Sequence, residues 1–106
     1  RSLVSYVNEH LHDPDLSLNL LSDHFDVSNA SVSRIFKNTV GQNFYNYITE
    51  KRMAKAKELL VLKGYCPREI ATEIGYDNEY SFKRAFQHTY GITPRDFLEK
   101  EGKNAR

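Results

Sequence analysis

Two segments of the chain repeat one another fifty residues apart, and each carries an arginine at the same place. Residues 28–41 align with residues 78–91 without a gap. The identities are Ser31 with Ser81, Arg34 with Arg84, Phe36 with Phe86, Thr39 with Thr89 and Gly41 with Gly91. An arginine side chain can form two hydrogen bonds with one guanine in the major groove of DNA. A duplicated helix with one arginine therefore suggests a surface that reads two equivalent features, such as successive grooves of a duplex.

The helical period predicts which residues of each repeat face outward. At about 100° per residue, one side of each segment is apolar and the opposite side is polar. The residues expected inside are Val32, Ile35, Phe36 and Thr39, and then Phe82, Ala85 and Phe86. The residues expected on the outward side are Ala30, Ser33, Arg34 and Lys37, and then Tyr80, Lys83, Arg84 and Gln87. Both segments are thus predicted to expose an arginine that can contact a base.

The polar residues around the two arginines suit contacts with the DNA backbone. Lys37 and Lys83 lie near the flanks of their helices, where a phosphate is the expected partner. Backbone contacts are expected from Ser28, Ser31, Lys37, Asn78, Ser81 and Gln87. The roles of Tyr80 and Glu79 each allow two interpretations. Tyr80 is either a base or sugar contact or a partly buried ring, and Glu79 is either an acceptor from cytosine or an acid that favours the helix start.

The distribution of charge favours this interpretation over a protein-interaction module. The net charge is only +1 over 106 residues, which suits a helical module that binds a protein partner. Residues 27–49, however, contain no carboxylate, so the first repeated segment presents only positive charge. A helical protein-interaction module without DNA specificity is the alternative interpretation.

The chain lacks the residue sets of common catalytic and metal sites. Its histidines are His10, His12, His24 and His88, and no cluster of cysteines or carboxylates completes a zinc site with them. No phosphate-binding loop and no nucleophile motif occurs. We therefore expect no enzyme activity, no metal and no cofactor. Cys66 is the single cysteine, so no disulfide can form within the chain.

Glycine and proline divide the chain into short helical segments, and no alternating pattern predicts a strand. We predict helices over residues 2–12, 18–25, 29–40, 43–62, 67–74 and 79–90, a last helix that starts at Thr93-Pro94, and a frayed polar tail over residues 99–106. The expected N-caps are Ser17, Ser28, Asp77 or Asn78, and Thr93. The sequence therefore predicts an all-α fold.

The predicted helices form two helix-turn-helix units joined by a long linker helix. The first unit and the linker occupy residues 1–62, and the second unit occupies residues 63–106. A linker of this length spans about 28 Å. Successive major grooves on one face of DNA recur every ~34 Å. The linker therefore has the right scale to hold two groove-reading helices on one duplex.

Four sequence blocks, in this order, resemble the DNA-binding domain of the AraC/XylS family of bacterial transcription regulators. They are Arg52-Met53-Ala54-Lys55-Ala56-Lys57-Glu58-Leu59-Leu60, Ile70-Ala71-Thr72-Glu73-Ile74-Gly75-Tyr76, Phe82-Lys83-Arg84-Ala85-Phe86 and Gly91-Ile92-Thr93-Pro94-Arg95-Asp96-Phe97. The resemblance covers nearly the whole chain. It implies a seven-helix fold with two homeodomain-like helix-turn-helix units in adjacent major grooves of double-stranded DNA. It also implies activation of transcription with RNA polymerase.

The resemblance assigns the base-reading residues position by position. They fall on Ala30, Ser33 and Arg34 in the first unit, and on Glu79, Tyr80, Lys83 and Arg84 in the second. Cys66 stands at a cap position that usually holds serine or threonine, and we expect it to be an indifferent cap. Family members generally join this domain to a sensor, receiver or ligand-binding domain, so we expect an N-terminal regulatory domain that this chain lacks. The isolated domain is expected to be a cytoplasmic monomer. Whether the full-length protein is tethered to a membrane is left open by the sequence.

Overall fold

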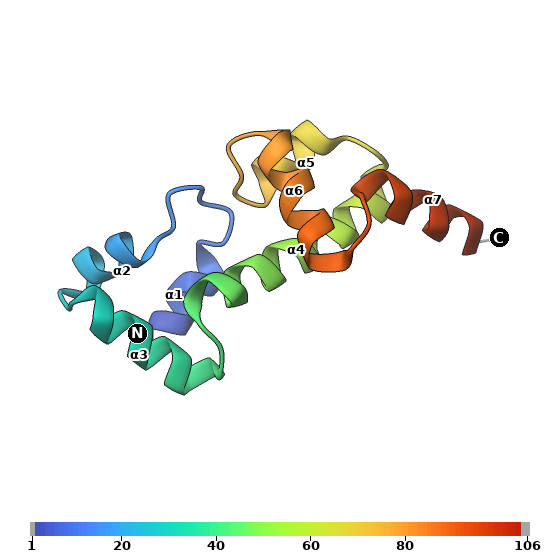
Figure 1. Ribbon diagram of the computed structural model, residues 1–106. Coiled ribbons are helices and arrows are strands. Elements are labelled where there is room, and N and C mark those ends of the chain that lie inside the picture. Colours follow the sequence, from blue (N-terminus) through green and yellow to red (C-terminus); the bar gives the residue numbers. More distant parts are fainter. Residues whose placement is uncertain (1, 105–106) are drawn as a thin grey trace.

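The computed structural model describes the backbone of residues 2–104 and the side chains of residues 2–101, and this range holds seven helices and no strand. The helices are α1 (Leu3–Glu9), α2 (Leu18–Phe25), α3 (Asn29–Val40), α4 (Phe44–Lys63), α5 (Pro67–Glu73), α6 (Glu79–Tyr90) and α7 (Pro94–Asn104). The molecule is elongated, at 50 × 24 × 22 Å. Helix α4 joins the group α1, α2 and α3 to the group α5, α6 and α7 (Figure 1). The predicted all-α class is confirmed.

Side-chain caps fix where most of the helices begin. Each cap accepts a hydrogen bond from the backbone amide three residues further on, at 2.8–3.1 Å. The caps and their donors are Ser2 with Ser5, Ser17 with Leu20, Ser28 with Ser31, Asn43 with Asn46, Asn78 with Ser81 and Thr93 with Asp96. Such a cap satisfies a helix-start amide that has no partner within the helix. Of the two alternatives predicted for α6, Asn78 is the cap.

The first helix is shorter than the predicted residues 2–12. Helix α1 ends at Glu9, and the amide of His10 donates to the carbonyls of Tyr6 and Val7, both at 3.1 Å. The ring of His10 also bonds back, with Nδ1 2.8 Å from the carbonyl oxygen of Tyr6. Leu11 extended the apolar pattern beyond this end because it packs on the core from the following loop. Apolar spacing therefore overestimated the helix by one turn.

The last helix is longer than predicted. Residues 99–104, which were expected to fray, continue α7 to Asn104, and residues 105–106 of the predicted tail lie outside the described residues. This turn contains Glu99, Lys100 and Glu101, which have high intrinsic helix propensity. The prediction gave too much weight to polarity, because an exposed helix turn needs no apolar face.

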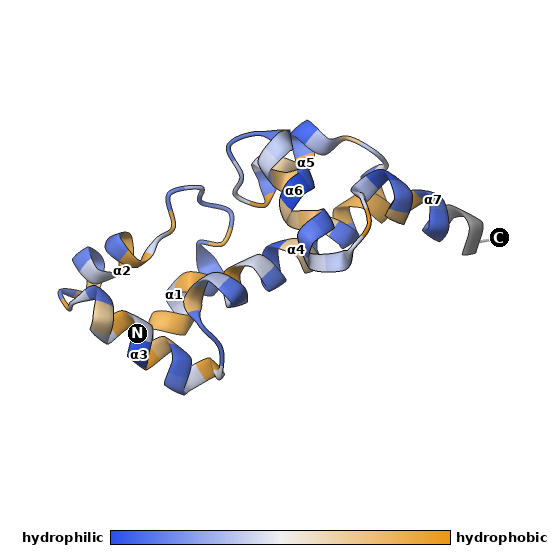
Figure 2. Cartoon of the chain, viewed as in Figure 1, coloured by the Kyte–Doolittle hydropathy of each residue, from blue (hydrophilic) through white to orange (hydrophobic). Residues whose placement is uncertain are grey.

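Two apolar clusters, one toward each end of α4, hold the helices together (Figure 2). The first contains Leu3, Val7, Leu16, Leu21, Val32, Phe36, Phe44, Tyr47 and Ile48. The second contains Met53, Ala56, Leu59, Leu60, Ile70, Ala71, Ile74, Phe82 and Phe86. Helix α4 contributes to both clusters, and the four residues 49–52 lie between its two contributions. Each helix-turn-helix unit thus has its own core, and α4 is the element that they share.

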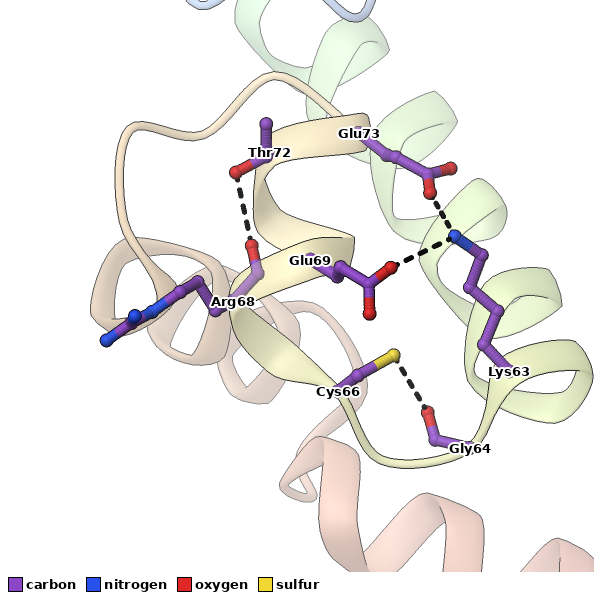
Figure 3. A network of polar contacts seen from close by, with 7 residues as sticks. All are labelled: Lys63, Gly64, Cys66, Arg68, Glu69, Thr72 and Glu73. Atoms are coloured by element: carbon purple, nitrogen blue, oxygen red, sulfur yellow. Dashed lines mark hydrogen bonds and ion pairs between the residues drawn. The ribbon is translucent and has the colours of Figure 1, made fainter.

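Polar contacts fix the start of α5 against the end of α4 (Figure 3). The ammonium of Lys63 on α4 pairs with the carboxylate of Glu73, and it lies 3.7 Å from Oε1 of Glu69. The side chain of Cys66 makes no cap bond to the helix, and its Sγ donates instead to the carbonyl of Gly64 at 3.6 Å. Burial raises the pKa of this thiol. Cys66 therefore makes no side-chain cap bond, in line with the prediction of an indifferent cap.

Candidate nucleic-acid interface

The first helix-turn-helix unit consists of α2, a tight turn and α3. The turn is made by Asp26, which adopts the left-handed conformation with φ of 56°. Val32 and Phe36 are fully buried and hold α3 on the core. The ring of Phe36 lies edge-on to the rings of Phe44 and Tyr47, with centroid distances of 5.5 and 5.0 Å. These contacts fix which side of α3 faces solvent.

The outward side of α3 carries the predicted positive charge. Ala30, Arg34 and Lys37 are exposed, whereas Ser33 is partly buried. Within the described residues, neither Arg34 nor Lys37 has an ion-pair partner. The guanidinium of Arg34 makes one long contact, with Nη2 3.5 Å from Oγ of Ser31. Arg34 is thus available to a ligand in solvent.

Two residues predicted to be inside are exposed. Ile35 is 42% exposed, and Thr39 is also exposed, with its hydroxyl donating to the carbonyl of Ile35 at 2.8 Å. The core contact of α3 follows a narrower line, through Val32, Phe36 and the partly buried Val40. These three residues are spaced four apart, so they form a single row along α3. Ile35 and Thr39 lie beside this row and remain in solvent.

The second unit consists of α5, a turn and α6. Phe82 and Phe86 are fully buried and hold α6 on the second core. Ala85, which was expected beside them, is only partly buried. Of the outward residues, Arg84 and Gln87 are exposed and Tyr80 is 66% exposed. Tyr80 is therefore not the partly buried ring of the second interpretation, and its contact with a base or sugar stays a prediction.

The outward side of α6 differs from that of α3 because it contains an ion pair. The ammonium of Lys83 lies 3.1 Å from Oε1 of Glu79, and Nε of Arg68 lies 3.9 Å from Oε2 of the same carboxylate. Hydrogen bonding to Glu79 raises the pKa of Lys83. The guanidinium of Arg84 stands apart from this pair, 5.7 Å from the ring centroid of Tyr80. Glu79 is therefore a partner of neighbouring cations as well as an acid at the helix start.

The residues predicted to contact the DNA backbone lie at the starts and flanks of α3 and α6. Ser28, Lys37, Asn78, Ser81 and Gln87 are exposed and Ser31 is partly buried. The hydroxyl of Ser28 donates to that of Ser31 at 3.0 Å while its oxygen caps α3. The structure thus brings the predicted residues of each unit onto one helix and its cap.

Two residues beside α6 were missed by the sequence prediction. A shallow groove of about 470 Å³ is lined by Tyr65, Tyr80, Lys83, Arg84, Gln87, Thr93, Pro94, Arg95 and Asp96. The guanidinium of Arg95 lies 4.3 Å from the ring centroid of Tyr65. The repeat gave no signal for Arg95, because the same offset pairs it with Tyr45 and not with another arginine. No sequence signal marked Tyr65 either.

Two of the four histidines, His10 and His24, pack against the ring of Tyr6. Tyr6 stacks on His10 with ring centroids 4.0 Å apart and contacts His24 at 4.4 Å. Among the described residues, no three histidine, cysteine or acidic side chains gather where they could hold a metal ion. In the same part of the chain, no helix has the length and apolar character needed to cross a membrane.

Comparison with known proteins identifies the family. The helix-turn-helix domain family matches residues 21–100. The F1 operon positive regulatory protein of Yersinia pestis is 29% identical over 96 residues, which cover 91% of this chain and 32% of that protein. The C-terminal domain of AraT, a response regulator from Geobacillus stearothermophilus, has a TM-score of 0.85 and 32% identity, covering 91% of this chain and 79% of that one. The chain belongs to the AraC/XylS family.

The AraC-type match concerns the DNA-binding part of the regulators. The DNA-binding domain of AdpA, solved in complex with a target DNA, shares the fold with a TM-score of 0.81 at 22% identity, over 92% of this chain and 86% of that one. The chain spans about a third of the length of the curated relatives it matches. Its family and fold are those of DNA-binding transcription regulators and not of enzymes.

Proposed function

We propose that α3 and α6 enter two adjacent major grooves of one DNA duplex and read a bipartite site. The observation that carries this proposal is the equivalence of Arg34 and Arg84, which occupy the same position on duplicated helices and are both exposed. Helix α4 has 20 residues, so it spans about 30 Å. This length is close to the ~34 Å between successive major grooves on one face of DNA. One chain can then do what two subunits of a dimer do, without a palindromic site.

Within this arrangement, Arg34 and Arg84 each bind a guanine through two hydrogen bonds. The other base-reading positions are Ala30 and Ser33 on α3, and Glu79, Tyr80 and Lys83 on α6. Lys37, Gln87 and the residues at the two helix starts contact phosphates. Glu79 reads cytosine only where Lys83 turns toward the DNA, because the two side chains pair with each other. The sequence preference of α6 therefore depends on two residues acting together.

We further propose that the full-length regulator activates transcription with RNA polymerase under the control of a separate regulatory domain. Two facts support this: several curated relatives are about three times as long as the chain, and one of them is a positive regulatory protein. The domain itself acts as a cytoplasmic monomer. It divides into residues 1–62, with the first helix-turn-helix unit and the linker helix, and residues 63–106, with the second unit.

Selection of bound duplexes from a random pool tests the proposed function. The expected result is a motif of two conserved blocks about 10 base pairs apart, or one helical turn. Affinity should also fall steeply with salt, since each phosphate contact adds nearly one unit to the log–log slope. Enrichment of a single block, or no enrichment over random duplex, would contradict the proposal.

A further inference from the structure

We propose that Arg52 is a positioning residue that locks the two helix-turn-helix units into one orientation, so that their recognition helices fit a single spacing on DNA. This inference rests on the proposed function, since it concerns how the two units act on one duplex. It begins from the separation of the two apolar clusters. Residues 49–52 of α4 lie between the last side chain of the first cluster, Ile48, and the first of the second cluster, Met53.

The contacts of Arg52 reach both units. Its Nε donates to the carbonyl of Leu11 and its Nη2 to the carbonyl of Asp13, both at 2.9 Å. These carbonyls belong to the loop between α1 and α2, in the first unit. On its other side the guanidinium lies 5.3 Å from the ring centroid of Tyr76, in the turn between α5 and α6. One planar side chain thus connects a loop of the first unit to the turn of the second.

The burial of Arg52 and Tyr76 favours a contact between them that persists in solution. Burial lowers the pKa of its guanidinium and raises the pKa of the Tyr76 hydroxyl, and the interaction between the two groups opposes both shifts. A guanidinium stays charged nonetheless. Its planar group holds several N–H donors in fixed directions, so it can donate to two carbonyls at once. A lysine ammonium could not reproduce this geometry.

The turn of the second unit approaches the first unit closely at the same point. Gly75 has φ of 97° and is buried. A Cβ built there would lie 2.6 Å from the carbonyl oxygen of Leu11 and 2.8 Å from Nη2 of Arg52. Only a glycine allows the backbone of the second turn to come this near to the first unit.

Helix packing between the two units runs mainly through α4. In the described part of the chain, α4 is the one helix that packs extensively against helices of both units. A groove of about 370 Å³ opens beside the junction, lined by Asn8, Leu11, His12, Lys51, Arg52, Ala54, Lys55, Glu58, Glu73 and Ile74. The units therefore do not form one continuous core, and Arg52 supplies the directional contacts between them.

The test compares Arg52→Met with Lys55→Met. Both remove one positive charge from α4, but Lys55 is exposed and pairs only at the surface, with Glu58 at 3.5 Å. The first measurement uses no DNA: residual dipolar couplings of backbone amides in a weakly aligned sample. In the wild type and Lys55→Met, one alignment tensor should describe both units. In Arg52→Met, each unit should require its own tensor.

The second measurement uses the selected two-block duplex, a set of duplexes with the blocks moved closer or apart by one to three base pairs, and a duplex with one block. We expect Arg52→Met to lose roughly tenfold in affinity at the best spacing, because a looser link lowers the effective concentration of the second unit. Its preference for one spacing should flatten. Its affinity for the single-block duplex should stay within about twofold of the wild type.

Three results would overturn the inference. They are a single tensor for both units in Arg52→Met, an unchanged spacing preference, and an equal loss of affinity in Lys55→Met. Should circular dichroism show that Arg52→Met does not fold, Arg52→Gln takes its place in the same measurements, since its side chain cannot reach both carbonyls. Failure to select a two-block motif would instead contradict the proposed function, and the dipolar couplings would still decide whether Arg52 orients the units.

Discussion

The turns of the two helix-turn-helix units are built differently. In the first, Asp26 takes the left-handed conformation at an exposed position. In the second, the corresponding bend is at Gly75, which is buried against Leu11 and Arg52. Aspartate tolerates the φ of 56° at Asp26 because its short polar side chain can bond locally, whereas the φ of 97° at Gly75 is strained for any side chain. The comparison shows that the second turn needs glycine for two reasons, its φ of 97° and the close approach of Leu11 and Arg52.

The outward sides of the two recognition helices differ in charge as well. Helix α3 lies in a stretch without carboxylates, whereas Lys83 on α6 is paired with Glu79. A free cation attracts any phosphate, while a paired cation must first give up its partner. We therefore expect the first unit to supply more of the sequence-independent affinity and the second unit to be more selective.

The largest expected effect tests whether the two cores are separate. Phe36→Ala and Phe86→Ala should each lower the free energy of unfolding by about 3–5 kcal/mol, because both rings are fully buried and leave a cavity. Hydrogen exchange should show where the loss falls: amides of α3 should exchange faster than those of α6 in Phe36→Ala, with the reverse in Phe86→Ala. Equal acceleration throughout α3 and α6 in both variants would show a single cooperative core.

The next effect sharpens the comparison of the turns. Gly41→Ala should cost about 1–2 kcal/mol of unfolding free energy, because φ of 81° is unfavourable for alanine and nothing lies within 4 Å of the added Cβ. Gly75→Ala should cost at least about 3 kcal/mol, since it adds a backbone collision to the same strain. Urea unfolding followed by circular dichroism measures both. Equal costs would mean that Gly75 serves conformation only.

The sequence could predict a feature where the interacting residues are close in the chain, and could not where they are far apart. The Ser28 cap was predicted, and Asn78 was one of two predicted caps of α6, because cap and donor are three residues apart. Phe36 and Phe86 were placed inside by their helical period. The role of Arg52 was not predictable, because its partners Leu11 and Asp13 lie about forty residues away in the chain. The sequence marked Gly75 as a helix breaker and gave no sign of what it contacts.

The same distinction applies to the recognition helices. Period analysis placed Arg34 and Arg84 outside, and the structure shows both exposed. It also placed Ile35 inside, where the structure exposes it, because the width of the buried stripe is set by the neighbouring helices and not by the sequence of α3. Which of the exposed residues contact bases stays a prediction.

Arg34→Ala and Arg84→Ala test that prediction. Each should cost about 1–3 kcal/mol of binding free energy on the selected duplex and relax the preference at one base pair, with little change in stability. Lys37→Ala is the matched control, since a lost phosphate contact should weaken selected and random duplexes alike. Fluorescence anisotropy with both duplexes measures the difference. Equal losses on selected and random DNA for the two arginine variants would make them phosphate contacts.

The smallest effect concerns the ion pair on α6. Glu79→Gln should raise the affinity for random duplex roughly twofold to fivefold, because it releases Lys83. Glu58→Gln is the matched control, as its partner Lys55 lies on α4, away from both recognition helices. An equal gain in the two variants would indicate a general effect of net charge and would remove the contrast between the two outward sides.

A pH titration separates the same alternatives in the free protein. Hydrogen bonding to Glu79 is the main cause that raises the pKa of Lys83 above its ordinary value of 10.5. A raised folded-state pKa means that the pair stabilises the protein below the ordinary pKa and stops doing so as pH rises through the folded value. The pKa of Lys83 followed by NMR should therefore fall in Glu79→Gln, and the stability difference between variant and wild type should shrink above about pH 10.5. An unchanged pKa would show that the pair does not persist in solution, so that Lys83 would be as free as Lys37 and the two recognition helices would present equivalent charge to DNA.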